Sequence, residues 1–370
     1  MNQLDLACAQ FRTLLEDQQN RLAKMNQTPV DFSKKEKIVI GLVDGDGIGP
    51  IIMAQAKRIL EQLLKAELAS GKVELRQVNG LTYENRIAQG KTLPEDVLEQ
   101  IKACDVLLKG PTQTPMGGTM ESANVALRRA LDLYANVRPV SVPEEGIDWI
   151  FFRENTEGEY VLGSRGLNLP GMAVDFKVTT DLGTKRIARA AMNYAAKNGK
   201  SRVSVVTKAN IMKKTDGKFT QIAHEVAEEY PGLTVDDWYV DIMAANLIDT
   251  NIRSGFQVFL LPNLYGDILT DEAAQIQGGV GSAGSANIGD RYAMFEAIHG
   301  TAPRLIEAGL GDYANPTSIL RAAVLMLQHI GFGEIAGKLE NALNDCTLQV
   351  AVETGVTCKN FGDALVAELN

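Results

Sequence analysis

The sequence predicts an α/β protein whose strands are mainly parallel. Short apolar stretches alternate with longer amphipathic stretches along the chain, and turns rich in glycine or proline separate them. The chain has 370 residues, of which 45% are hydrophobic and 22% are charged. These are globular values, and the length fits about two domains.

The first elements follow from the positions of apolar residues. Residues 1–36 are typical of an amphipathic helix followed by a polar linker, with an apolar face formed by Leu4, Phe11, Leu15 and Leu22. Such a helix either packs on its own domain or contacts a second subunit. The pattern then predicts a strand at 37–43, a helix to about residue 69, a strand at 73–78, a helix near 93–103 and a strand at 105–108.

The later elements continue the alternation. A longer alternating stretch at 171–180 is typical of an antiparallel excursion. We then expect a helix at 181–198, a strand at 202–207, another helix, a strand at 233–240, a strand at 257–261 and a helix that begins near Gly266. After the glycine-rich run 278–289, the chain is expected to be mostly helical.

Charge and cysteine content argue against several classes of protein. The net charge of −9 disfavours non-specific binding to nucleic acid or to acidic membranes. The cysteines are widely spaced and form no C-x-x-C pair, so neither a zinc site nor a redox pair is predicted, and a reducing compartment fits. The N-terminal segment lacks a targeting pattern, and no apolar run is long enough to span a bilayer. We therefore expect a cytoplasmic protein without nucleic-acid or membrane partners.

The glycine-rich loop after the first strand does not match a Rossmann fingerprint. Gly45, Gly47 and Gly49 have the wrong spacing, and Pro50 follows directly. Asp44 and Asp46 would also repel a pyrophosphate. The loop is either a tight strand-to-helix turn with acidic caps or an acidic rim of an active site.

Asp267 and Asp271 form the first candidate site. They are four residues apart on a predicted helix, so both carboxylates project from one face. Paired carboxylates repel unless a cation lies between them, and oxygen ligands suit Mg²⁺ or Mn²⁺. The alternative is a capped helix start with solvated acids.

The second candidate site is an anion site on the helix that begins at Ser122. A helix N-terminus attracts anions through free N–H groups, and Asn124 lies in its first turn. Arg128 and Arg138 follow, and arginine grips carboxylates in a bidentate manner. A simple cap with surface arginines is the alternative.

Three further segments carry weaker signals. Residues 153–160 place Arg153 and Tyr160 among several acids, and Lys208 follows a strand at the end where α/β active sites form. The loop from His299 to Pro303 is rich in small residues at a predicted helix start, where a nucleotide can approach the backbone. An ordinary turn is the alternative for this loop.

Taken together, these segments identify the chain as similar to the isocitrate/isopropylmalate dehydrogenase family from about residue 37 to residue 370. The motifs that carry the resemblance occur in the family's order: Gly-Asp-Gly-Ile-Gly-Pro, Leu-Tyr-Ala-Asn-Val-Arg-Pro, Arg-Glu-Asn-Thr-Glu-Gly, Asn-Leu-Tyr-Gly-Asp-Ile-Leu-Thr-Asp and His-Gly-Thr-Ala-Pro.

The resemblance implies a fold and an assembly. A helical extension at 1–36 would precede a discontinuous large cofactor-binding domain at 37–133 and 278–370. A smaller domain at 134–277 would bind substrate and metal and form the interface of a homodimer. The dinucleotide would bind without a Rossmann fold, and each active site would draw residues from both subunits.

The resemblance also assigns roles to residues. Substrate would be bound by Ser122, Asn124, Arg128, Arg138, Arg153 and Asn210. The cofactor would be bound by Thr114, His299, Gly300, Thr301, Ala302, Arg304 and Asn315. Mg²⁺ or Mn²⁺ would be bound by Asp267 and Asp271 of one subunit and Asp241 of the other. Lys208, directly or through Asp241, would help to remove the hydroxyl proton, and Tyr160 would protonate the enolate left after loss of CO₂.

Substrate and cofactor follow from where the chain departs from the family's variants. Ser122 and Asn124 are polar where isopropylmalate enzymes have an apolar pocket, which favours isocitrate; 3-isopropylmalate, homoisocitrate and tartrate-type acids are the alternatives. Leu305, Ala314 and Asp312 favour NAD, whereas Arg304 leaves NADP open. A non-catalytic regulatory subunit is a distant alternative, because such subunits tend to lose a catalytic Lys, Tyr or metal-binding Asp that this chain retains.

Overall fold

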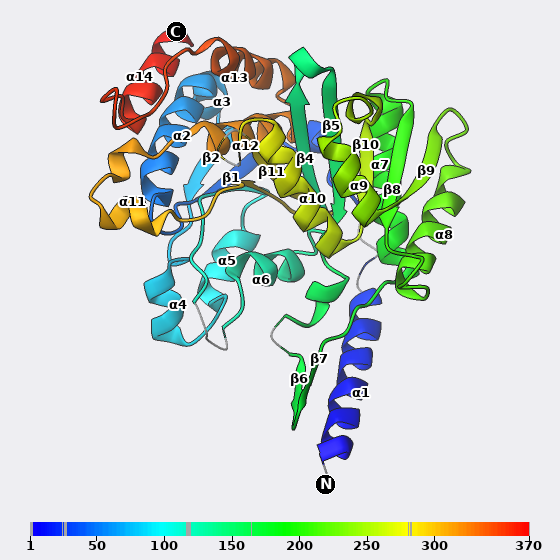
Figure 1. The fold of residues 1–370 in the computed structure, drawn as a ribbon. Coiled ribbons are helices and arrows are strands. Elements are labelled where there is room, and N and C mark those ends of the chain that lie inside the picture. Colours follow the sequence, from blue (N-terminus) through cyan, green and yellow to red (C-terminus); the bar gives the residue numbers. More distant parts are fainter. Residues whose placement is uncertain are drawn as a thin grey trace. The chain divides into compact units, whose positions relative to one another are not determined.

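The structure is a computed structural model of the whole chain (Figure 1). It describes residues 3–23, 25, 28–115, 120–163, 165–279, 281 and 283–369. The chain divides into two compact units: the first unit contains residues 1–29, 132–136 and 141–272, and the second unit contains residues 30–131, 137–140 and 273–370. Both units combine helices with a largely parallel sheet, so the predicted α/β class is confirmed.

The second unit contains a sheet with the strand order β2-β1-β3-β12-β11. Its strands are β1 (Ile38–Val43), β2 (Val73–Gln77), β3 (Val106–Lys109), β11 (Gly284–Ile288) and β12 (Ala293–Ala297). Its helices are α2 (Gly49–Leu63), α3 (Lys65–Ala69), α4 (Tyr83–Gln89), α5 (Glu95–Lys102), α6 (Ala123–Ala130), α11 (Pro303–Glu307), α12 (Thr317–His329), α13 (Gly333–Asp345) and α14 (Cys358–Glu368). Strand β1 pairs in parallel with β2 and β3, and β11 pairs antiparallel with β12.

The first unit contains a sheet with the strand order β5-β10-β8-β9, and all of its pairings are parallel. Its strands are β5 (Ile147–Glu154), β8 (Arg202–Thr207), β9 (Thr234–Tyr239) and β10 (Val258–Leu261), with a separate hairpin of β6 (Leu167–Leu169) and β7 (Met172–Val174). Its helices are α1 (Gln3–Leu22), α7 (Asp181–Lys197), α8 (Thr215–Ala227), α9 (Val240–Ile248) and most of α10 (Asn263–Ile276). Strand β4 (Ala135–Val142) contributes residues to both units.

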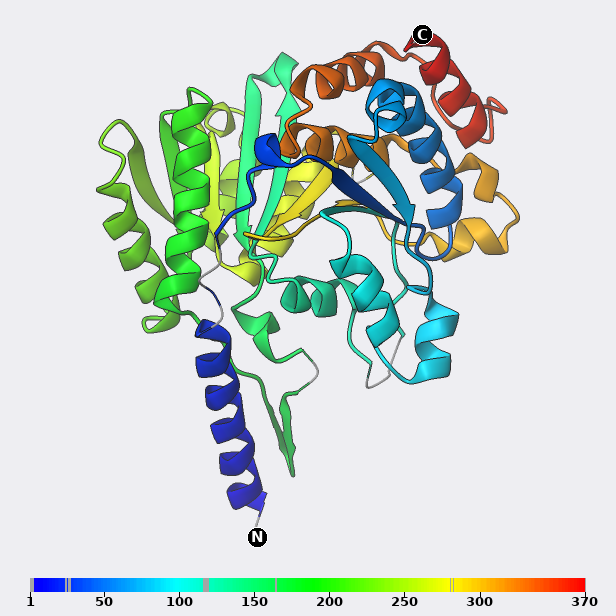
Figure 2. The same cartoon turned by 180° about the vertical axis from the view of Figure 1, so that it is seen from behind.

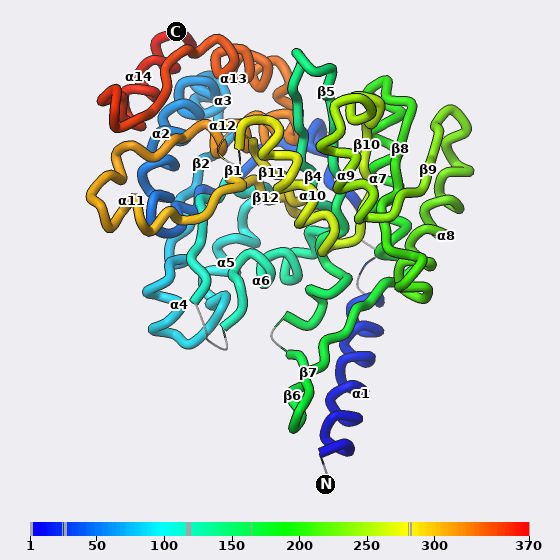
Figure 3. The backbone as a smooth tube through the Cα atoms, in the orientation of Figure 1, coloured from blue at the N-terminus to red at the C-terminus, as the bar shows by residue number. Residues whose placement is uncertain are grey.

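Continuous apolar runs explain the central strands of both units. The side chains of β10 are buried along its whole length, as a parallel strand covered on both faces requires. In the second unit, α12 packs on β11, β12 and α13, and α14 packs on α2 (Figure 3). The buried residues Ile319, Leu320 and Leu327 recur on α12 at helical spacing and form the inner part of this core.

Several predicted elements differ from the structure. The C-terminal third contains the β11–β12 hairpin before its helices, because small residues hide the alternation that marks a strand; residues 280 and 282 of the glycine-rich run lie outside the described residues. The stretch 171–180 makes the predicted antiparallel pairings, through strand β7 with β6 and through Val178 with Gly158, but its one regular strand is shorter than expected. Helix α10 begins at Asn263 rather than near Gly266.

Helix α1 is present as predicted, but its buried face differs. Leu14 and Gln18 are buried, whereas Leu4 and Leu15 are largely exposed. The helix packs on its own unit beside the β6–β7 hairpin (Figures 1 and 2). Among the described residues, no helix is long and apolar enough to cross a membrane.

Candidate functional site

The predicted carboxylate pair lies on α10, directly after β10 ends and Pro262 turns the chain. Asp267 and Asp271 are one helical turn apart. Asp267 forms an ion pair with Arg153 and accepts a hydrogen bond from the Tyr160 hydroxyl at 2.6 Å. Three residues that the sequence placed in separate motifs therefore meet at one carboxylate.

Gly266 makes this meeting possible. A Cβ atom at this position would lie 2.5 Å from Cγ of Arg153, so only glycine lets the arginine pass. Arg153 is 1% exposed, and its Nε and Nη2 atoms donate to Asn263 Oδ1 at 3.0 and 2.7 Å. These hydrogen bonds fix the guanidinium in one orientation, in which its remaining edge is directed at the Asp267 carboxylate.

The carboxylates of α10 fit a hard divalent cation in part. Carboxylate oxygens are the ligands that Mg²⁺ and Mn²⁺ prefer, and Mg²⁺ is commonly held by one or two carboxylates with waters and substrate oxygens. Within the part of this chain that the structure describes, no three His, Cys, Asp or Glu residues form a metal-binding group. Asp267 and Asp271 could therefore supply two oxygen ligands to such an ion.

Lys208 and Asp241 form a second cluster in the first unit. They follow strands β8 and β9, which are parallel neighbours. Because the register pairs Thr207 with Tyr239, the C-terminal ends of the two strands lie together. Lys208 Nζ lies 2.5 Å from Asp241 Oδ1, and this hydrogen bond lowers the pKa of the Asp241 carboxyl. Asn210, two residues beyond Lys208, is exposed.

A residue that sequence reasoning missed connects these two clusters. The side chain of Lys177 is 6% exposed, and its Nζ lies 2.6 Å from Asp216 and 3.1 Å from Glu159. It also lies 4.4 Å from the centre of the Tyr265 ring. Asp216 accepts a hydrogen bond from the backbone N–H of Lys208 at 2.8 Å. Lys177 thus joins the segments that carry Tyr160, Lys208 and Asp267, and no spacing in the sequence signals this role.

The anion-binding candidates at α6 lie in the second unit. Ser122 occupies the N-cap position of α6, as predicted, but its side chain does not cap the helix. Asn124 Oδ1 accepts a hydrogen bond from Thr112 Oγ1 at 3.1 Å. The N-terminus of α6 therefore keeps polar side chains without using Ser122 as a cap.

Arg128 on α6 faces a buried acid. Its Nη2 atom lies 3.2 Å from Glu296, which also forms an ion pair with the buried Lys109. Burial alone raises the pKa of Glu296, but the two positive charges outweigh burial and lower it to about 2. Arg138, the other arginine predicted for this anion site, is 7% exposed on β4.

The predicted cofactor loop packs against the glycine-rich loop of the second unit. The backbone oxygen of Thr301 accepts a hydrogen bond from Ile48 N at 3.1 Å, and a Cβ atom on Gly47 would lie 2.2 Å from it. Ala302 adopts the left-handed conformation, with φ 47°. Burial lowers the pKa of His299, which favours a neutral ring. Of the two acids of the glycine-rich loop, Asp46 accepts hydrogen bonds from the backbone N–H groups of residues 83 and 113 and does not cap its own helix.

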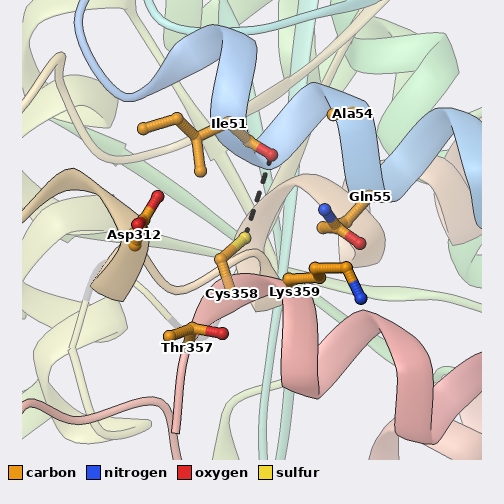
Figure 4. A pocket seen from close by; sticks show the side chains of 7 residues that line it. All are labelled: Ile51, Ala54, Gln55, Asp312, Thr357, Cys358 and Lys359. Atoms are coloured by element: carbon orange, nitrogen blue, oxygen red, sulfur yellow. Dashed lines mark hydrogen bonds between the residues drawn. The ribbon is translucent and has the colours of Figure 1, made fainter. Parts of the chain in front are cut away.

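A pocket of about 290 Å³ lies beside this region in the second unit (Figure 4). It is lined by Ile51, Ala54, Gln55, Asp312, Thr357, Cys358 and Lys359. Burial and the nearby Asp312 raise the pKa of the Cys358 thiol to about 12, so this thiol stays protonated. Lys359 is paired with Asp363, and Asp363 is also paired with Arg58. The other predicted cofactor residues are exposed: Thr114, Gly300, Arg304 and Asn315.

Comparison with known proteins gives consistent results. Residues 39–365 match the family model described as isocitrate/isopropylmalate dehydrogenase. The chain is 38% identical over 343 residues to a Caenorhabditis elegans protein named probable isocitrate dehydrogenase (NAD) subunit alpha, mitochondrial, with 90% of this chain and 92% of that protein covered. It is 41% identical over 310 residues to the isocitrate dehydrogenase (NADP) of Rickettsia felis, of which it spans 62%.

A solved structure gives the same result for the fold. The crystal structure of isocitrate dehydrogenase from Methylococcus capsulatus matches with a TM-score of 0.78 and 34% sequence identity. The match covers 90% of this chain and 99% of that chain.

Proposed function

Because the chain belongs to the isocitrate/isopropylmalate dehydrogenase family, we propose that it oxidises and decarboxylates isocitrate to 2-oxoglutarate and CO₂, with a divalent metal ion and with reduction of NAD. The observation that carries this proposal is the convergence of Arg153 and Tyr160 on Asp267, one helical turn from Asp271. Relatives named for isocitrate and for either NAD or NADP support the reaction class.

Each cluster has a distinct role in this proposal. A divalent ion bound by Asp267 and Asp271 would act as a Lewis acid that polarises the oxygen at C2 of the substrate. Lys208, held by Asp241, removes the proton of the 2-hydroxyl group. Tyr160 delivers a proton to C3 after CO₂ has left, and its hydroxyl is aimed by Asp267. Arg153 binds a substrate carboxylate.

The polar start of α6 predicts the choice of substrate. Ser122 and Asn124 can hydrogen-bond the third carboxylate of isocitrate, whereas the isopropyl group of 3-isopropylmalate would leave them unpaired. An unpaired polar group in a binding site costs about 1–3 kcal/mol, so we expect kcat/KM to favour isocitrate by at least about tenfold to a hundredfold. Steady-state rates of the purified chain with Mg²⁺ or Mn²⁺ and each acid test this. The reverse ranking would contradict the proposal, and no turnover by the chain alone would support a regulatory subunit.

The pocket beside the cofactor loop supports NAD as the cofactor. Asp312 offers a carboxylate that can accept hydrogen bonds from ribose hydroxyl groups, and it would repel a 2′-phosphate. The neighbouring Lys359 and Arg58 are already paired with Asp363. We expect a higher kcat/KM with NAD than with NADP. Asp312→Asn should lower the ratio of kcat/KM with NAD to kcat/KM with NADP. A preference for NADP in the unmodified protein would contradict this assignment.

We also propose a homodimer. Helices α9 and α10 of the first unit expose large apolar side chains, with Ile242, Ile248 and Ile268 between 46% and 63% exposed. Exposed apolar groups concentrated on neighbouring elements are typical of interfaces. In such a dimer, Lys208 and Asp241 act in the active site of the partner protomer. Size-exclusion chromatography with light scattering should give twice the chain mass.

A further inference from the structure

The segment that carries Tyr160 has little stability of its own. Tyr160 lies in a four-residue 3-10 turn, Glu159–Leu162, between Gly158 and Gly163. Both glycines have positive φ values, 72° and 59°, which other residues rarely adopt. A four-residue 3-10 turn between two glycines does not orient a side chain by itself. Its position must depend on contacts from other elements.

Helix α1 supplies such contacts along one of its faces. Arg21 lies near the C-terminal end of α1, and its Nη2 atom is 2.5 Å from Glu157, three residues before Tyr160. Its Nη1 atom is 3.4 Å from Thr156 Oγ1, and its Nε donates to Gln18 at 3.0 Å. The guanidinium therefore joins α1 to the chain just before the 3-10 turn.

The same helical face also holds the chain after Tyr160. Leu14 packs in one buried cluster with Val161 and Leu162. Further along the helix, Asp17 forms an ion pair with Arg165 at 2.8 Å, and the ring centres of Phe11 and Phe176 are 4.8 Å apart. Figures 1 and 2 show α1 running beside the β6–β7 hairpin within this segment. Helix α1 thus contacts the chain both before and after the turn that carries Tyr160.

The charge of Arg21 matters because Glu157, the acid with which it pairs, is buried. Glu157 is 3% exposed and also accepts hydrogen bonds from the backbone and hydroxyl of Thr180. The nearby Glu154 is buried too, and burial together with the charge of Glu157 raises its pKa to about 7. Arg186, the nearby cation on α7, is engaged by Asp132. Loss of Arg21 would leave Glu157 without the ion pair that fixes it.

We propose that α1 positions Tyr160 for proton delivery and that Arg21 is the positioning residue, through its ion pair with Glu157. This inference rests on the proposed role of Tyr160. It gives residues 3–22 a function in catalysis, although none of them needs to touch the substrate.

The test compares Arg21→Ala with Arg12→Ala, a matched change at an exposed position of the same helix. Arg21→Ala should lower kcat by about tenfold to a hundredfold, because a displacement of about 1 Å can cost that much, while KM for isocitrate changes little. In a single turnover, the amplitude of cofactor reduction should be retained, since hydride transfer precedes protonation. The exchange of C3 hydrogens of 2-oxoglutarate in D₂O, which needs the same proton transfer, should fall with kcat. Arg21→Lys should restore most of the rate.

Two results would overturn the inference. One is equal kcat in Arg21→Ala and Arg12→Ala. The other is a loss of single-turnover amplitude in proportion to kcat, which indicates loss of folded enzyme. If the unmodified chain does not turn over isocitrate, the proposed function fails instead. Amide hydrogen exchange at residues 157–162 then tests α1 without substrate: faster exchange in Arg21→Ala than in Arg12→Ala supports the inference, and equal rates overturn it.

Discussion

Replacing either Asp241 or Asp267 with asparagine is expected to abolish turnover, and combining the two inactive variants is expected to restore about a quarter of the wild-type rate. Asparagine keeps the shape of the side chain but removes its charge. A carboxylate that holds a catalytic metal ion contributes several kcal/mol, so each variant should lose about 10³-fold or more in kcat.

The recovery follows from the proposed sharing of residues between protomers. Within one chain, Asp241 belongs to the Lys208 cluster, and Asp267 belongs to the cluster of Arg153 and Tyr160. If each active site takes Asp267 from one protomer and Asp241 from the other, a mixed dimer has one intact site and one site with both changes. Random pairing makes about half of the dimers mixed, which gives the expected quarter of activity.

The measurement is steady-state turnover after co-expression or mixed refolding of the two variants. Glu272→Gln, on the same helix as Asp267, is a matched control that should keep activity. Thermal unfolding should show that each variant is folded. If the mixture is no more active than the single variants, the active site is not shared as we propose.

Lys177→Met is expected to lower the free energy of unfolding by about 3–5 kcal/mol. Lys177 and Asp216 are both almost fully shielded from solvent, and the change leaves the Asp216 carboxylate buried without its cation. Burial alone lowers the pKa of Lys177, but its acidic partners outweigh burial and raise it, so the lysine is charged at neutral pH. Activity should fall as well, because Asp216 holds the backbone of Lys208.

A double-mutant cycle in urea checks this expectation. Lys177→Met combined with Asp216→Asn removes both charges, and it should be more stable than the sum of the two single changes predicts. Lys197→Met, at an exposed position on α7, is the control and should have little effect. Additive effects of the two single changes would show that the ion pair does not hold this part of the first unit together.

Local patterns account for much of what was predicted. The strands at 37–43 and 202–207 and the helix at 181–198 were predicted within one residue of β1, β8 and α7, because long apolar runs and helical periodicity depend on neighbours in sequence. The hairpin β11–β12 was missed, because its small residues carry no such period. The prediction for the buried face of α1 was also wrong. Tertiary packing buries Leu14 and Gln18, and the predicted apolar face with Leu4 and Leu15 stays largely exposed.

The sequence by itself determined the α/β class, the family and the carboxylate pair of α10, because these depend on residue type and on short spacing. Only the tertiary structure decided which charges meet. Arg153 pairs with Asp267, Lys208 pairs with Asp241, and Lys177 connects three separate motifs. These contacts form because parallel strands place their C-terminal ends at one edge of the sheet, although the strands are far apart in the sequence. Likewise, Arg21 forms an ion pair with Glu157, although the two residues are 136 positions apart in the sequence. Where one partner is buried, as Asp216 and Glu157 are, an unpaired charge would be costly, and a linear sequence does not record burial.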